Sequence, residues 1–362
     1  MDDTRVEKAA AGISDNDGVR VSEAAIIEQL VGSAVVSAVP LRGGRNSKVV
    51  KVTTADGTRY VMKAYFGATM SGLDRLDVEV SALRFLGAAG VDSVPRVIRA
   101  LPEHGVALFE FIDGEPVSPD AATPDDIDAL VEFLAALKDL RGMPAAALLP
   151  SASEASFSIA GTVATLERRR ARLEAIAGAG PEYDDVRRFL AREFDPAVAD
   201  LTRAATREVA GIRYDEEIPA SNRTLSPSDF GLHNVIRRTG GTLAFHDFEY
   251  FGWDDPAKLC SDVLLHPAAP LTERQRGRFL AGAKTLFGSI PGFPDRLAAV
   301  YPLFGLMWVM IMLNEFHQGD LARRQFAGEP DPASDVRIRQ LALARAMLDR
   351  IVNDRDRQLL SS

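Results

Sequence analysis

Three polar residues in the stretch 225–262 stand at spacings that favour metal-assisted chemistry on a hydroxyl group. Asp229 and Asn234 are five positions apart in a loop-like run, and Asp247 follows further along the chain. A two-glycine turn at 240–241 separates two short apolar runs between them, which predicts a β-hairpin. Such a hairpin returns Asn234 and Asp247 to one edge, with Asp229 in the loop above. Together they would supply hard oxygen ligands for Mg²⁺ and a base for a substrate hydroxyl.

The D-x-x-x-x-N pattern, followed by D-F-E at 247–249, resembles the catalytic and metal-binding loops of the protein-kinase-like fold. With the G-W-D-D-P-A that follows, the stretch is similar to the aminoglycoside phosphotransferase and choline kinase family of small-molecule kinases. The resemblance implies that Asp229 is the base for the acceptor hydroxyl and that Asn234 and Asp247 bind Mg²⁺. Pro227 departs from the pattern, because that family usually carries a loop-steadying histidine there. The residues that could hold the loop instead are Ser226, Ser228 and His246.

Lys63 lies inside an apolar, strand-like run at 59–65, where an unpaired ammonium would be costly to bury. It therefore needs an acidic partner. The helix predicted over 74–86 places Glu79 near its apolar face, and Asp77 takes that role if the helix is rotated. In kinase-like proteins, which this pattern resembles, the lysine binds the α- and β-phosphates and the glutamate orients it. A solvated lysine and a solvated helix carboxylate are the plainer alternative.

Two further segments resemble parts of a kinase-like nucleotide site. The turn at 41–47 contains two glycines, which let backbone N–H groups approach phosphate oxygens, although such a turn often serves only as a hairpin. The side chains that can add donors there are Arg45, Asn46 and Ser47. The run at 106–112 resembles the hinge between two lobes, where backbone groups from Glu110 to Ile112 would hydrogen-bond the adenine edge.

The rest of the chain predicts the elements that must position these residues. Five runs rich in β-branched and aromatic residues predict the strands of a sheet beside one helix. They cover 34–39, 48–54, 59–65, 94–98 and 106–112. Later segments show helical periodicity. They cover 124–140, 158–177, 183–210 with a break near Pro196, 272–287, 294–317 and 336–354.

This order of strands and helices predicts an α+β, protein-kinase-like two-lobed fold, with a small antiparallel-sheet N-lobe and a larger, mostly helical C-lobe. Residues 1–20 are polar and lack apolar periodicity, so we expect a mobile leader. Residues 21–113 form the predicted N-lobe, which binds the nucleotide. Residues 114–362 form the predicted C-lobe, which carries the catalytic and metal loops and the acceptor-binding helices.

The composition argues against several other classes of protein. Of 362 residues, 46% are hydrophobic and 26% are charged, which is typical of a globular protein. The net charge of −9 argues against a nucleic-acid partner, and the single cysteine, Cys260, excludes an intrachain disulfide. The N-terminus lacks the pattern of a signal peptide, and the longest apolar run, 301–313, is shorter than the ~20 residues that span a bilayer. We therefore expect a cytoplasmic protein with no membrane partner.

The acceptor site is expected between the catalytic loop and the helices after the metal loop, as in the fold that the chain resembles. The candidate acceptor-site residues are His233, Glu249, Trp308 and Glu315. Acidic residues in this region, among them Asp254 and Asp255, would suit an amine-bearing acceptor, although a neutral sugar alcohol also fits.

The sequence therefore predicts a kinase that uses Mg²⁺ and either ATP or GTP to phosphorylate a hydroxyl of a small molecule. Aminoglycosides, amino sugars, sugars and related metabolites are the expected acceptors. The alternative is a catalytically weak, kinase-like protein that binds a nucleotide or has a regulatory role, because the usual loop histidine is missing. The sequence determines neither the nucleotide nor the oligomeric state.

Overall fold

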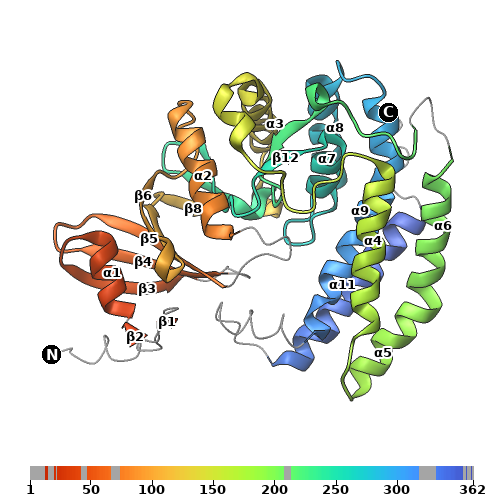
Figure 1. The fold of residues 1–362 in the computed structure, drawn as a ribbon, viewed down its shortest axis with the longest axis horizontal. Coiled ribbons are helices and arrows are strands. Elements are labelled where there is room, and N and C mark those ends of the chain that lie inside the picture. The colour runs from red at the N-terminus through yellow and green to blue at the C-terminus, as the bar shows by residue number, and fades with distance from the viewer. Residues whose placement is uncertain are drawn as a thin grey trace.

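A small sheet-rich part and a larger helical part lie beside each other in the computed structural model of the chain (Figure 1). This arrangement confirms the predicted α+β, kinase-like two-lobed fold. The structure describes residues 13–14, 20–21, 23–41, 47–66, 74–207, 213–317, 332–353, 356 and 360. Most of the expected mobile leader therefore lies outside the described residues. Where the expected leader meets the N-lobe, β1 (Ile13–Ser14) pairs with β2 (Arg20–Val21).

The N-terminal part is built on a five-stranded antiparallel sheet in the order β3-β4-β5-β7-β6. Its strands are β3 (Val35–Leu41), β4 (Ser47–Thr54), β5 (Arg59–Tyr65), β6 (Val97–Leu101) and β7 (Val106–Glu110). All five predicted strands are present. The fourth begins later than the predicted 94–98, because Pro95 has no N–H to donate to a neighbouring strand.

Different helices cover the two faces of this sheet, and this fixes the direction of each side chain on β5. Met62 and Ala64 pack in one buried cluster with residues of α1 (Glu23–Val31). Side chains alternate along a strand, so Lys63 points to the opposite face, toward α2 (Arg75–Ala88). A charged residue in the middle of an apolar strand thus faces the helix that carries acidic residues.

The C-terminal part is mostly helical, as predicted. Its helices are α3 (Pro124–Asp139), α4 (Ile159–Glu174), α5 (Pro181–Phe189), α6 (Asp195–Ala205), α7 (Pro256–Leu265), α8 (Glu273–Phe287), α9 (Phe293–Met312) and α11 (Ala333–Val352). The break expected near Pro196 is a π-helical turn at Leu190–Phe194, after which α6 starts with Pro196 in its first turn. Helix α7 was not predicted, because all ten of its residues are buried and it shows no polar face.

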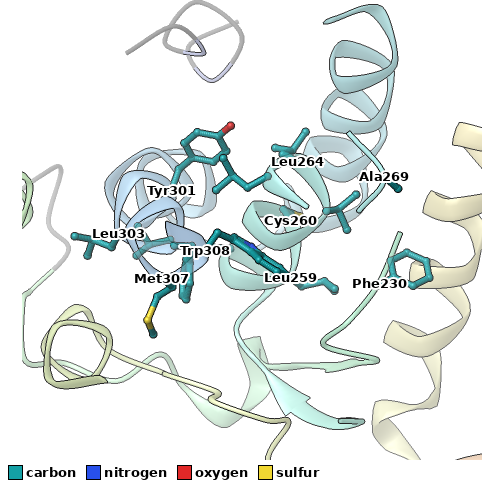
Figure 2. Packing of buried hydrophobic residues seen from close by; sticks show 14 of the residues in the cluster. Phe230, Leu259, Cys260, Leu264, Ala269, Tyr301, Leu303, Met307 and Trp308 are labelled. Carbon is teal, nitrogen blue, oxygen red and sulfur yellow. The ribbon is translucent and has the colours of Figure 1, made fainter. Parts of the chain in front are cut away.

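Helix α9 forms the apolar centre of this part. With the 3₁₀ turn Leu313–Phe316, it makes one helical segment that could cross a membrane by length and composition, but 72% of its most apolar window is buried inside the protein. Figure 2 shows α9 packed beside α7, with Trp308 on the side turned toward α7. The buried indole therefore connects the long apolar helix to the helix that follows the D-F-E segment.

Two short sheets carry the loops of the candidate site. In one, β10 (Val235–Arg238) pairs with β11 (Leu243–Phe245) and with β8 (Gly114–Pro116). In the other, β9 (Thr224–Ser226) pairs antiparallel with β12 (Gly252–Asp254). The predicted hairpin is confirmed as β10–β11. The sequence did not reveal β8, β9 and β12, because three residues are too few to show a period of two.

Candidate active site

The β10–β11 hairpin brings Asn234 and Asp247 to one edge. Asn234 lies directly before β10 and Asp247 lies two residues after β11, and the N–H of His246 donates to the carbonyl of Asn234 (3.1 Å). Asp247 has a φ of 68°, in the left-handed region that is unfavourable for a non-glycine residue. The side chain of Asp247 is 30% exposed. The hairpin thus places an amide and a strained, accessible carboxylate together, as a site for a hard cation requires.

Serine side chains hold the loop that contains Asp229. The N–H of Ser228 donates to Oγ of Ser226 (2.9 Å), and the hydroxyl of Ser228 donates to the carbonyl of Ser153 (3.3 Å). The side chain of Asn234 also stabilises the loop, because its Nδ2 donates to the carbonyl of Asp229 (2.9 Å). Of the three residues that we named as replacements for the missing loop histidine, Ser226 therefore accepts a hydrogen bond within the loop, and Ser228 ties the loop to Ser153.

Two histidines converge on one oxygen of Asp229. Nε2 of His266 lies 2.8 Å from Oδ1 of Asp229, and Nε2 of His233 lies 3.0 Å from the same oxygen. The two imidazole rings stack, with their centroids 3.8 Å apart and an interplanar angle of 13°. Burial by itself would raise the pKa of Asp229, but the hydrogen bonds with both histidines outweigh it and hold that pKa well below its usual value. Asp229 is therefore a carboxylate at neutral pH.

Lys63 lies in a buried cluster of carboxylates from both parts of the protein. Its Nζ is 2.7 Å from Oε2 of Glu79, 2.5 Å from Oδ1 of Asp247 and 3.1 Å from Oε2 of Glu249. Burial would lower the pKa of Lys63, but the three carboxylates raise it well above its usual value, so Lys63 is charged. Asp77, the alternative partner, is exposed. The predicted Lys63–Glu79 pair is therefore present.

Residues that the sequence did not reveal fix the acidic members of this cluster. The hydroxyl of Tyr65 donates to Oε2 of Glu79 (2.6 Å), and the N–H of Phe248 donates to Oε1 (3.2 Å). The Nε atom of Arg75 lies 3.9 Å from Oε1 of Glu249. Tyr65 could have been found, since it is two residues after Lys63 on β5 and so shares its face. The position of Arg75 depends on how α2 meets the D-F-E segment, which no local pattern encodes.

The remaining predicted nucleotide contacts lie around the sheet. Ser47 begins β4 and is buried. Glu110 ends β7, and its N–H already donates to the carbonyl of Arg96 (2.9 Å). Ile112, two residues later, is 6% exposed. The other predicted residues of the phosphate-binding turn, which fall outside the described part of the chain, are Arg45 and Asn46.

Trp308 and Glu315, the two predicted acceptor residues on α9 and the turn that follows it, lie at different positions along the helix axis. The rings of Trp308 and His266 form a T-shaped contact with centroids 4.5 Å apart, and Nε1–H of Trp308 donates to Oδ1 of Asp262 (3.1 Å). Glu315 lies about 10 Å further along the helix axis, in the 3₁₀ turn, where its carbonyl accepts from Nε of Arg337 (3.2 Å). Trp308 thus meets the loop that contains Asp229 through His266.

The acidic residues that we expected to suit an amine-bearing acceptor are paired inside the protein. Nζ of Lys258 lies 2.8 Å from Oδ2 of Asp254 and 3.0 Å from Oδ2 of Asp262. Oδ2 of Asp255 lies 2.6 Å from Nε of Arg296. Both Asp254 and Asp255 are nearly fully buried. Both carboxyl groups are therefore paired inside the protein and are not presented to a ligand.

The sheet with its Lys63–Glu79 pair, followed by a helical part with an Asp-Asn loop and a D-F-E loop, defines the class of protein-kinase-like phosphotransferases. A family model described as the phosphotransferase enzyme family matches residues 37–297. The chain belongs to that family. No protein of curated function matches the sequence significantly.

Solved structures of kinase-like enzymes share the fold at low sequence identity. A spectinomycin phosphotransferase in complex with ADP and spectinomycin aligns with a TM-score of 0.59 and 13% identity over 90% of this chain and 98% of that one. A choline kinase from Streptococcus pneumoniae gives 0.55 and 17% identity over 90% and 98%. An amicoumacin kinase in complex with AMP-PNP, Ca²⁺ and Ami gives 0.55 and 14% identity over 91% and 94%.

Proposed function

We propose that this protein is a small-molecule kinase that transfers the γ-phosphoryl group of ATP or GTP to a hydroxyl group. The observation that supports this most strongly is the contact of Lys63 with both Glu79 and Asp247. Through this contact Lys63, which is suited to binding nucleotide phosphates, lies beside Asp247, which is suited to binding a metal ion. The two residues come from different parts of the fold. Phosphoryl transfer needs such positioning of charge more than it needs covalent chemistry.

Asn234 and Asp247 are the residues that would hold Mg²⁺. Their donor set fits, because carboxylate and amide oxygens are the hard ligands that Mg²⁺ prefers. When bound, the cation neutralises charge on the nucleotide phosphates. Lys63, oriented by Glu79, would bind the same phosphates, and the buried cluster would keep its ammonium charged.

Asp229 is the proposed base, and its low pKa defines how it acts. A carboxylate with such a pKa cannot remove an alcohol proton in advance. It can orient the hydroxyl and accept the proton as the new bond to phosphorus forms, which suits a loose transition state. Both histidine contacts of Asp229 involve Oδ1, so Oδ2 is the oxygen that we assign to the acceptor.

The acceptor is a small hydroxylated molecule, and His233 and Trp308 are the residues that we place beside it. The similar structures include enzymes named for spectinomycin, choline and amicoumacin, which supports an antibiotic, amino sugar or related metabolite. Glu249 fits the Lys63 cluster better than the acceptor site, because it is buried between Lys63 and Arg75.

A screen of hydroxylated amines, sugars and antibiotics would test this function. Each compound is added to the protein with Mg²⁺ and ATP or GTP, and acceptor-stimulated nucleotide consumption is measured against an Asp229→Ala blank. We expect at least one compound to raise consumption in the wild type only. Tight nucleotide binding with no consumption under any condition would instead favour a nucleotide-binding protein without turnover.

A further inference from the structure

His266 ends α7 and approaches the catalytic loop with a defined tautomer. Its Nδ1 accepts a hydrogen bond from the N–H of Ala268 (3.2 Å), so this nitrogen carries no proton. Burial lowers the pKa of His266, which favours the neutral form of the ring. The single ring proton therefore lies on Nε2, which donates to Oδ1 of Asp229 at 2.8 Å. His266 is 6% exposed, so water does not compete readily for this hydrogen bond.

Helix α7 touches the catalytic loop at two points. At its C-terminal end His266 binds Asp229, and in its first turn Nζ of Lys258 lies 3.4 Å from the hydroxyl oxygen of Ser228. Asp262 connects these ends, because it binds Lys258 and accepts from the indole N–H of Trp308. The ring of Trp308 makes a T-shaped contact with His266. The fully buried helix thus fixes the loop that lacks its usual histidine.

We propose that His266 is the positioning residue for the catalytic carboxylate. Its Nε2–H fixes Oδ1 of Asp229, so that Oδ2 is turned to the acceptor hydroxyl. The proposal rests on the kinase function given above and adds to it that His266 orients the carboxylate of Asp229. His266 does not contact the reacting atoms and acts through Asp229.

The same side chains have the composition of a transition-metal site, since ligand atoms of Asp229, His233 and His266 lie within 4.8 Å of one another. A metal would take the Nε2 lone pair of His266 and force its proton onto Nδ1. That proton would then face the N–H of Ala268, a second donor, and the existing hydrogen bond would be lost. The environment of His266 therefore favours a hydrogen-bond donor to Asp229 over a metal ligand.

Basal hydrolysis of Mg·ATP, in which water replaces the acceptor, tests this role without knowledge of the acceptor. His266→Ala should lower kcat about 100-fold, because a slightly misplaced base is costly, while KM for Mg·ATP changes less than about twofold. His266→Gln keeps an N–H donor near the place of Nε2 and should recover at least about tenfold of that loss. Ser261→Ala is the matched control, because its hydroxyl donates within α7, to the carbonyl of Ala257, and bonds to no other residue in the described part of the chain. It should keep the wild-type kcat.

Two results would overturn the positioning role. The first is a His266→Ala variant with the kcat of the wild type. The second is that kcat falls equally in the Ala and Gln variants, in proportion to the decrease in their Tm, because a general loss of stability would then explain the effect. Nitrogen-15 NMR of the histidine rings gives a readout that needs no turnover. We expect an unprotonated Nδ1 at His266, and a protonated Nδ1 would contradict the proposal even in an active enzyme. A wild type with the expected tautomer but no phosphoryl transfer to any acceptor or to water would instead contradict the proposed function.

Discussion

The ammonium nitrogen of Lys63 lies 2.5 Å from a carboxylate oxygen of Asp247, although 184 residues separate them in the chain. Lys63 comes from the middle of the N-terminal sheet, and Asp247 comes from the end of a hairpin in the helical part. The contact joins the two parts at the place where a nucleotide phosphate and its cation would lie. It also brings Lys63 into contact with three carboxylates, so we expect this lysine to matter for stability as well as for nucleotide turnover.

Lys63→Met should reduce both stability and nucleotide turnover. It leaves Glu79 and Asp247 without their cation and Glu249 with Arg75 alone, and removing one partner of a buried ion pair costs about 3–5 kcal/mol. Loss of the phosphate-binding charge should lower turnover about 10²- to 10³-fold. Urea unfolding and Mg·ATP consumption measure the two effects.

Lys51→Met is the matched control for this change. Lys51 lies on the neighbouring strand β4, where its ammonium approaches the ring of Phe111 at 5.8 Å. Such a contact is worth about 1 kcal/mol or less at a partly exposed site. If both variants lose the same stability, the carboxylate cluster is not the cause.

Gly252→Ala should disturb the catalytic loop from a distance. A Cβ at Gly252 would come 2.4 Å from the carbonyl oxygen of Pro150 and 2.5 Å from the backbone nitrogen of Ala152. Backbone atoms cannot move aside cheaply, so β12 must shift together with β9, which leads to Asp229. We expect a loss of about 1–3 kcal/mol in the free energy of unfolding, together with lower activity.

Gly240→Ala tests whether that loss is specific. Gly240 lies in the β10–β11 turn and has no atom within 4 Å of an added Cβ. It should change the stability by less than about 0.5 kcal/mol, as most surface substitutions do. An equal loss in both variants, measured by urea unfolding, would show that the contact of Gly252 with Pro150 is not responsible.

The buried carboxyl of Asp254 should give a pH-dependent stability. Burial, opposed by Lys258, raises its pKa from 3.8 to about 6. Between these two values the folded protein keeps a proton that the unfolded chain has released, so stability falls as pH rises through this window. The total is at most about 3 kcal/mol. Urea unfolding from pH 4 to pH 7 should show wild type losing stability relative to Asp254→Asn, and a constant difference between them would contradict the shifted pKa.

Local patterns predicted the parts of the site that follow from local physical rules. A buried ammonium needs a carboxylate, so Lys63 led to Glu79. A two-glycine turn between short apolar runs predicted the hairpin that joins Asn234 to Asp247. These features depend on a few neighbouring residues, and the fold does not override them.

The parts that were missed depend on tertiary packing. Helix α7 is buried on all sides, so its sequence shows no amphipathic period, and without that helix the role of His266 could not be seen. Two local signals could have revealed it: Asp255 followed by Pro256 is a helix-start pattern, and Asp254, Lys258 and Asp262 stand at four-residue intervals. The same missing helix explains why we expected Asp254 to serve an acceptor, although its charge is paired internally.

The central claim, that Asp229 is the base of a phosphoryl transfer, is tested most directly by Asp229→Asn. The measurement is the rate of Mg²⁺-dependent transfer from the nucleotide to the best acceptor of the screen, beside the nucleotide affinity from calorimetry. The amide keeps the shape of the side chain but cannot take the proton. We predict a fall of at least about 10²-fold in the transfer rate, with the nucleotide Kd changed by less than about threefold because Lys63 and Asp247 are untouched. A variant that transfers phosphate at the wild-type rate would contradict the claim.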